Sequence, residues 1–456
     1  MRIGTFLLAS LLAFPLAAAE PFADVDKAVI DVLGKSGAPS ASIAIVQDGK
    51  LAYTRAYGQA DVASKTPASP QMRYSIGSIS KQFTAAALLL LAEEGRLSLD
   101  DKVIRWMPDL TRAGDVSIRH LLSMTSGYQD FWPQDYVMPG MLEDVTVEKI
   151  LNDWAKKPLD FEPGSKWQYS NTNYVIAGAI VNRVSGMPFF EFLQRRIFTP
   201  LGMTTVYNTD QAALGPEDPV RYHRYSLAPV RVAPKEGRGW MYAAGGLAMT
   251  AADLAKWDVA MIERKLLKPE SWAEMQREIL LTSGAGTNYG LGVSVATVDG
   301  RRVISHGGEV SGFTARNEVY PDERAAIIVF TNLDATDASS QIASKIAPSI
   351  FTASDPGRQQ ALERAKAIFA GLQRGKVDRS LFTSNANAYF SEEAISDFAS
   401  TLRPFGTPKE FTQAAQSLRG GMVARRYRVV TPKKTFRIST FWMPDGKLEQ
   451  YIVTAE

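Results

Sequence analysis

A serine and a lysine stand three residues apart in the segment from Tyr74 to Lys81, just before an expected amphipathic helix at 82–94. If Ser78 opens that helix, Ser78 and Lys81 share one face and can meet. A serine hydroxyl becomes a nucleophile when a neighbouring group takes its proton, and a lysine of lowered pKa can do so. The free N–H groups of a helix start also suit a developing oxyanion. Taken alone, however, the spacing favours a helix-capping serine with a surface lysine.

A tyrosine and an asparagine form a second candidate pair, two residues apart, ahead of a helical pattern at 174–184. Tyr169 and Asn171 face the same side if the chain is extended there. A tyrosine can relay a proton, and an asparagine amide can orient a lysine or a substrate carbonyl. Taken alone, a buried tyrosine with a capping asparagine is the simpler interpretation.

A third candidate lies where a β-rich run enters two glycines, in the segment Ser305 to Glu309. Gly307 and Gly308 permit close approach of another backbone or of a ligand. The alternative makes His306 a polar residue at a strand end and the glycines a bulge.

The strands and helices that position these residues predict an α+β fold. Asp-Gly turns at Asp48 and Asp299 indicate two hairpins. The economical arrangement is one antiparallel sheet built from both ends of this region, flanked by helices, with a helical subdomain inserted between about 80 and 280; separate sheets are the alternative. The β-rich runs are 40–46, 51–57, 289–296, 303–306, 314–320 and 325–331, and a helical pattern follows at 338–351.

The charge balance changes near a turn-rich linker at 352–357. The 456-residue chain has a net charge of +3, yet from Gly357 onward 16 basic residues face 9 acidic ones. This predicts a larger domain at 20–355 and a small α+β domain at 358–456, with a helix at 359–373 and strands at 421–430, 435–442 and 447–453. The basic excess is either a solvated face or a surface that touches anionic envelope polymer.

Residues 1–19 predict a secretory signal peptide. A charged start at Arg2 precedes an apolar stretch at 6–16 and three alanines. The stretch is short for a membrane span, although a retained anchor is the alternative. We expect a periplasmic or secreted protein without stable membrane insertion after signal removal.

Composition excludes several classes of function. The absence of cysteine rules out disulfides, thiolate metal sites and a cysteine nucleophile. The three histidines have no helical zinc spacing, and no carboxylate cluster indicates a metal, so we expect neither metal nor cofactor. No Gly-x-Ser-x-Gly elbow indicates a lipase-type α/β-hydrolase, and no basic motif indicates nucleic-acid binding.

Together, Ser-x-x-Lys, Tyr-x-Asn and a strand motif of His, any residue and Gly resemble the serine penicillin-recognising enzymes. The resemblance is to the branch with class C β-lactamases, D-alanyl-D-alanine peptidases of the same fold, D-aminopeptidases and family VIII esterases. It covers roughly residues 25–350 and includes further similar segments at 118–127, 161–174, 200–203, 244–254 and 289–292.

The resemblance implies a role for each motif residue. Ser78 would be the nucleophile that forms an acyl-enzyme, and Lys81 the first candidate for its base, with Tyr169 as the alternative. Tyr169 would carry the proton to the leaving group, and Asn171 would hold Lys81 or the substrate amide. The backbone N–H groups of Ser78 and Glu309 would form the oxyanion hole. His306 stands where β-lactamases carry lysine, with Gly308 at the glycine position.

That histidine predicts the substrate class. Lysine there is a permanent cation that pairs with a substrate carboxylate, whereas histidine is mostly neutral at pH 7. We therefore expect hydrolysis of a small ester or D-amino-acid peptide, with weak or no β-lactamase activity. The alternative is an inactive relative that binds peptidoglycan-type peptides. The aromatic loop 128–136 and the residues Tyr222, His223 and Tyr225 either wall the substrate cleft or pack at the surface.

Overall fold

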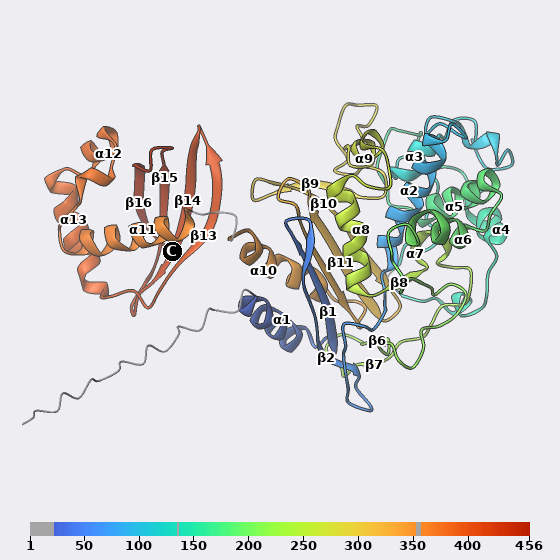
Figure 1. Cartoon of the computed structure of the whole chain (residues 1–456), viewed down its shortest axis with the longest axis horizontal. Helices are drawn as coiled ribbons and strands as arrows, with labels where there is room; N and C mark the ends of the chain where they lie inside the picture. Colours follow the sequence, from blue (N-terminus) through green and yellow to red (C-terminus); the bar gives the residue numbers. More distant parts are fainter. Residues whose placement is uncertain (1–21, 135, 353–356) are drawn as a thin grey trace, which may run out of the picture.

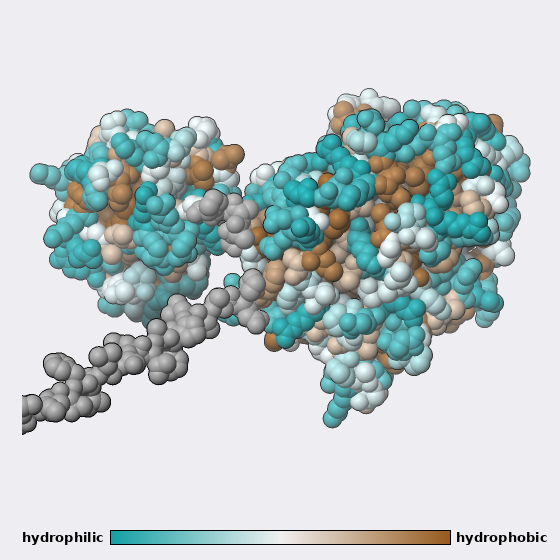
Figure 2. All heavy atoms as spheres, viewed as in Figure 1, coloured by the Kyte–Doolittle hydropathy of each residue, from teal (hydrophilic) through white to brown (hydrophobic). Residues whose placement is uncertain are grey.

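The computed structural model describes residues 22–134, 136–352 and 357–456, so the predicted signal peptide lies outside the described residues. Within these ranges, no helix combines the length and the apolar character that crossing a membrane requires. Figure 1 shows a larger unit and a smaller C-terminal unit. In the view of Figure 2, hydrophilic residues cover much of the surface of both units, and smaller hydrophobic patches are scattered among them.

A seven-stranded antiparallel sheet runs through the larger unit in the order β3-β2-β1-β12-β11-β10-β9. Strands from the two ends of this unit meet at its centre, where Ala41 pairs with Thr331 and Val46 with Ala326. Both central strands are buried and rich in β-branched residues, which suits the middle of a sheet. The prediction of one sheet is therefore confirmed. The strands are β1 (Ser40–Gln47), β2 (Lys50–Asp61), β3 (Thr66–Pro67), β9 (Ser294–Val298), β10 (Arg301–Val310), β11 (Phe313–Tyr320) and β12 (Ala325–Thr331).

Helices cover both faces of this sheet (Figure 1). On one face, α1 (Ala23–Ser36) and α10 (Ala338–Thr352) pack over Ile43 and Ile45. On the other, α8 (Ala251–Glu263) packs over the alternate side chains Ala44 and Val46. The alternation of β1 residues between two cores is the period-2 pattern of a strand buried on both sides.

The inserted helical region shares the α8-side core, in which Phe83 and Trp257 pack with ring centroids 4.7 Å apart. Its helices are η1 (Gly77–Ile79), α2 (Ser80–Glu93), η2 (Val103–Arg105), α3 (Ile118–Leu122), η3 (Pro139–Leu142), α4 (Val147–Ile150), η4 (Leu151–Ala155), α5 (Asn171–Ser185), α6 (Phe189–Leu193), η5 (Gln194–Phe198), α7 (Tyr242–Gly245) and α9 (Pro269–Met275). Its short strands are β4 (Tyr74–Ser75), β5 (Tyr207–Asn208), β6 (Tyr222–His223), β7 (Arg231–Val232) and β8 (Leu247–Met249).

The strand predicted at 289–296 is wrong at its start, because β9 begins only at Ser294. Two glycines explain the difference. A Cβ at Gly290 would lie 2.3 Å from the Met275 carbonyl oxygen, and one at Gly292 would lie 2.9 Å from that of Lys81. Gly292 also has φ +74, so this segment turns tightly against α2 instead of extending.

The C-terminal unit is a four-stranded antiparallel sheet, β13-β14-β15-β16, with helices against one face. Its separate core includes Phe369, Tyr427 and Trp442. Strand β13 was missed in the sequence, because its mostly polar residues give no strong β signal. The elements are α11 (Arg358–Gln373), η6 (Arg379–Leu381), α12 (Ser384–Tyr389), α13 (Glu392–Leu402), η7 (Arg403–Phe405), β13 (Glu410–Arg419), β14 (Met422–Val430), β15 (Thr435–Trp442) and β16 (Leu448–Ala455).

Candidate active site

Ser78 lies in the 3-10 turn η1, which leads directly into α2. This places Ser78 and Lys81 on one face, and the Nζ of Lys81 lies 2.8 Å from the Oγ of Ser78. The capping alternative does not fit, because no side chain caps the start of α2 and Lys81 is fully buried. The pair is therefore arranged for proton transfer rather than for helix capping.

Lys81 contacts two further oxygen atoms. Its Nζ donates to Oδ1 of Asn171 and to the backbone carbonyl of Ala244, each at 2.8 Å. Burial lowers the pKa of the Lys81 ammonium to about 7, although the negative charge of Asp130 works in the opposite direction. Both oxygens can only accept hydrogen bonds, so a neutral Lys81 would donate its two N–H groups to them. Its lone pair is then left facing the hydroxyl of Ser78.

Tyr169 lies over the same pair. Its ring centroid is 4.9 Å from the Nζ of Lys81 and 6.3 Å from the ring of His306. Burial raises the pKa of the Tyr169 hydroxyl, while its hydrogen bond with Ser78 works in the opposite direction. The hydroxyl therefore stays protonated at neutral pH and can pass on a proton only as another is received.

Asn171 begins α5, and its position depends on Asp130, a residue that the sequence analysis did not single out. Asp130 accepts hydrogen bonds from the backbone N–H of Asn171 at 2.9 Å and from its side-chain amide at 3.3 Å. It also accepts from the backbone N–H of Trp132 at 3.2 Å. The carboxylate thus joins the aromatic loop to the residue that holds Lys81. An acidic residue within the aromatic loop was the only signal of this in the sequence.

His306 is buried, and both of its ring nitrogens have partners. Nδ1 lies 2.5 Å from the Gly307 carbonyl, so it carries the proton and donates. Nε2 then accepts from the hydroxyl of Tyr289 at 2.9 Å. Burial, reinforced by the charge of Lys81, lowers the pKa of His306 to about 3. The imidazole is therefore neutral at any pH near 7. Tyr289 is a second residue whose role the sequence did not reveal.

The glycines of β10 bring two backbones together beside the nucleophile. A Cβ at Gly308 would lie 1.9 Å from the carbonyl oxygen of Ile76 and 3.4 Å from the backbone nitrogen of Ser78. A Cβ at Gly77 would lie 2.8 Å from the backbone nitrogen of Glu309. Only glycine fits at these two points, and the backbone nitrogens of Ser78 and Glu309 come close together as a result. The side chain of Glu309 accepts from the Ala335 backbone N–H at 2.8 Å.

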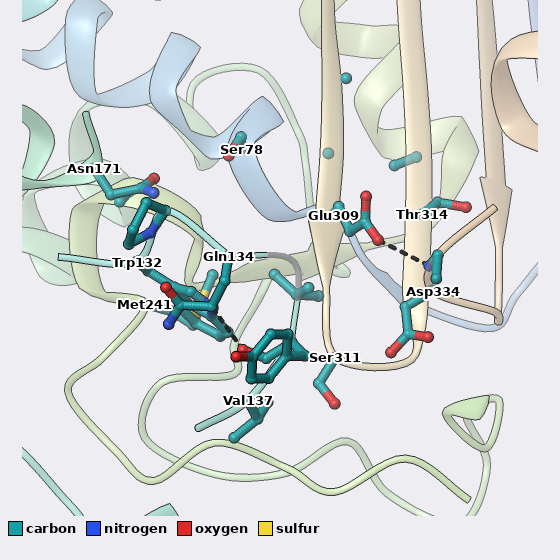
Figure 3. A pocket seen from close by; sticks show the side chains of 18 of the residues that line it. Ser78, Trp132, Gln134, Val137, Asn171, Met241, Glu309, Ser311, Thr314 and Asp334 are labelled. Atoms are coloured by element: carbon teal, nitrogen blue, oxygen red, sulfur yellow. Dashed lines mark hydrogen bonds between the residues drawn. The ribbon is translucent and has the colours of Figure 1, made fainter. Parts of the chain in front are cut away.

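Ser78 opens into a cavity of about 960 Å³ with two different walls. Figure 3 shows Trp132, Gln134 and Met241 on one side, and Glu309, Thr314 and Asp334 on the other. The first wall is mainly apolar, and the second is polar and acidic. The aromatic loop walls the cavity through Asp130, Phe131, Trp132, Pro133, Gln134 and Tyr136.

Of Tyr222, His223 and Tyr225, which the sequence placed either in the wall of the cleft or at the surface, only two lie at the cavity. His223 and Tyr225 line the cavity. Tyr222 is buried elsewhere, where its hydroxyl contacts Asp61 and the backbone of Val62.

Among the residues that the structure describes, no group of three or more His, Asp or Glu side chains is placed to hold a metal ion. The chemistry available from these side chains is attack by an activated serine next to two backbone N–H donors.

This fold and this site define a serine hydrolase. The family model described as Beta-lactamase matches residues 25–347, and the chain belongs to that family. A penicillin-binding protein of Bacillus subtilis is 28% identical over 390 residues, which are 80% of this chain and 84% of the relative.

Two solved structures add to this. A D-stereospecific amidohydrolase from Streptomyces sp. is 26% identical with a TM-score of 0.62, covering 71% of this chain and 97% of that one. The D-amino acid amidase of Ochrobactrum anthropi, complexed with L-phenylalanine amide, shares the fold at 23% identity and a TM-score of 0.65. That match covers 74% of this chain and all (100%) of the amidase.

Proposed function

We propose that this protein is an exported serine hydrolase that cleaves a small ester or a D-amino-acid amide or peptide through an acyl-enzyme on Ser78. The observation that carries the proposal is the buried Lys81, which is bonded to Ser78 and has a pKa lowered to about 7. A lysine in solution holds its proton too tightly to serve as a base at neutral pH, and this one does not.

The first half-reaction uses these contacts. Lys81 takes the proton of Ser78 while Oγ bonds to the substrate carbonyl carbon, and the carbonyl electrons move to its oxygen. The backbone N–H groups of Ser78 and Glu309 stabilise that oxyanion. As it collapses, the bond to the leaving group breaks. Tyr169 gives its proton to the leaving amine or alkoxide and regains one from Lys81, which leaves an acyl ester on Ser78.

In the second half-reaction, water attacks the acyl ester along the same path in reverse. Lys81, helped by Tyr169, takes a proton from the water, and Ser78 leaves as the alcohol after regaining one. Asn171 keeps the amine of Lys81 in place throughout, through the bond at 2.8 Å. Lys81, not Tyr169, is the main base in this scheme, because burial lowers the pKa of the amine and raises that of the phenol.

The neutral His306 supports a substrate without a carboxylate at that position. Its ring nitrogens are occupied by Gly307 and Tyr289, so it offers no cation to such a group. The nearby Arg316 is bonded to Glu318 at 2.8 Å and to Ser305 at 3.3 Å. A penicillin carboxylate has no cation to pair with at the His306 position, and turnover of a β-lactam should accordingly be weak or absent. The amidohydrolase and amidase similarity favours D-amino-acid amides.

The second candidate is an inactive protein that binds peptidoglycan-type peptides, favoured by similarity to a penicillin-binding protein. The two are separated by intact-protein mass spectrometry of wild type beside Ser78→Ala. Each is mixed with a p-nitrophenyl ester, a D-alanyl peptide, a D-amino-acid amide and a penicillin. Turnover or an acyl adduct that requires Ser78 supports the hydrolase. Binding without turnover or adduct in wild type supports the inactive protein.

A further inference from the structure

The C-terminal sheet has one face buried and one face open to solvent. Side chains alternate along β14 and β15, and Tyr427, Val429 and Ile438 face the core below α11. The residues between them, Arg426 and Arg428 on β14 and the members facing them on β15, point the other way and are exposed or half-buried. We call this second side the outer face.

Three arginines gather on the outer face. Arg428 pairs directly with Arg437 across the two strands, and Arg426 stands two residues from Arg428. All three are exposed. Like charges directly opposite each other weaken a sheet, so this arrangement favours an anion close to both side chains. The end of the sheet where these strands meet also carries exposed lysines: Lys409, Lys433 and Lys434.

The structure shows what fits between two of these arginines. The carboxylate of Glu456 lies 3.1 Å from the guanidinium of Arg428 and 3.5 Å from that of Arg437. Glu410 lies 3.9 Å from Arg428. Guanidinium groups match carboxylates in shape and charge, and these two are spaced to share one. The two acidic residues offset only part of the positive charge on this end of the sheet.

The rest of the outer face mixes polar side chains with apolar ones, among them Phe441 and the exposed Ile452. Its hydroxyl and amide side chains can hydrogen-bond to alcohols. Phe441 is half-buried there with the guanidinium of Arg419 5.3 Å above its ring, which forms a small flat platform. A lipid surface would require a broader apolar area. The polar residues are Thr412, Ser417, Ser439, Gln450 and Thr454.

We propose that the outer face of the C-terminal sheet binds an anionic polysaccharide by holding the carboxylate groups of the polysaccharide. Arg426, Arg428 and Arg437 hold the carboxylates, and the surrounding hydroxyl and amide groups bind the sugar hydroxyls. The binding is independent of the proposed function, because the arginines lie on the C-terminal sheet, whose hydrophobic core is separate from the core of the unit that contains Ser78. It would keep the enzyme on a polymer while the cavity acts on small substrates.

The test uses the full chain and sodium polygalacturonate as the carboxylate polysaccharide, with binding measured by titration calorimetry at low and high salt. The face variant combines Arg426→Gln, Arg428→Gln and Arg437→Gln. The matched control combines Lys366→Gln, Arg374→Gln and Lys376→Gln, which remove the same charge from the α11 side of the unit. Uncharged dextran, phosphatidylglycerol vesicles and a single-stranded oligonucleotide are tested in parallel.

The proposal predicts salt-sensitive binding of polygalacturonate that falls by about tenfold or more in the face variant and stays close to wild type in the control. Circular dichroism should show both variants folded, and ester hydrolysis should be the same in all three proteins. Equal loss in both variants would show a diffuse charge effect and overturn the proposal. Tighter binding to vesicles or to the oligonucleotide than to polygalacturonate would overturn it too.

Discussion

The cavity around Ser78 and the outer face of the C-terminal sheet handle positive charge in opposite ways. Lys81 is fully buried, bonded to three oxygens, and has a pKa lowered to about 7. Arg428 and Arg437 keep 47% and 60% of their side chains exposed. Burial disfavours the charged form of an amine, so it loses its proton more easily and can act as a base. An exposed guanidinium keeps its charge and can only attract anions. Burial therefore suits Lys81 to act as a base in the cavity, whereas exposure leaves the arginines of the outer face charged and able to attract an anion.

The largest test of this contrast replaces the buried amine. Lys81→Met keeps the length of the side chain but removes the base, so kcat/KM for an ester should fall by about 10³-fold. Lys81→Arg should not restore activity, because a guanidinium keeps its proton. Steady-state hydrolysis of a p-nitrophenyl ester measures both. Substantial activity in Lys81→Met would move the role of base to Tyr169.

The next test widens the gap between the two backbones beside Ser78. Gly308→Ala puts a Cβ 1.9 Å from the Ile76 carbonyl, so β10 must shift away from Ser78 and kcat should fall by about 10²-fold. Gly307→Ala is the matched control, since its nearest atom would be 3.9 Å away and activity should stay near wild type. Equal effects in the two variants would contradict the oxyanion-hole role of this strand.

A subtler test removes a negative charge that acts on Lys81. The charge of Asp130 raises the pKa of the amine, so Asp130→Asn should lower it further. Lys81 must be neutral to act as a base, and activity rises as pH passes its pKa. The rising limb of the pH–rate profile should therefore move to lower pH, by about half a unit or more. Asp334→Asn, also in the cavity wall, should leave the midpoint in place. A shift toward higher pH would disprove this electrostatic link.

The smallest effect is expected on the exposed side of the comparison. Arg428→Gln loses its ion pairs with Glu410 and Glu456, but exposed pairs stabilise proteins by less than about 1 kcal/mol. The melting temperature should change by no more than about 2 °C. Scanning calorimetry at low and high salt checks this. A drop of several degrees would mean that the arginine cluster serves the fold.

Motif spacing in the sequence predicted the residues of the site better than the residues that hold them in place. Ser78, Lys81, Tyr169, Asn171 and His306 were singled out, and the structure brings them together. Their partners were not found, because a hydrogen bond between residues far apart in the chain leaves no periodic pattern. The carboxylate of Asp130 reaches Asn171 across 41 positions, and Tyr289 reaches His306 across 17.

The fold shows the same division. Runs of β-forming residues and turn signals predicted the central strands and most of the C-terminal strands, and the simplest arrangement of these strands joined both ends of the larger unit in one sheet. These signals missed β13, whose pattern is polar, and misplaced the start of β9, where two glycines turn the chain. Periodicity detects a strand that buries one face or both, but it does not detect a mostly polar edge strand or a run of apolar residues bent by close packing.

The sequence by itself determined which chemistry is available: a serine and a lysine at helical spacing, a tyrosine and an asparagine ahead of another helix, and a histidine in place of a permanent cation. Only the tertiary structure decided the protonation of these groups. Packing removed Lys81 from water and brought its pKa near 7, and it tied His306 to Tyr289 so that the imidazole stays neutral. Spacing can specify which groups meet, but a pKa depends on everything that surrounds the group in space.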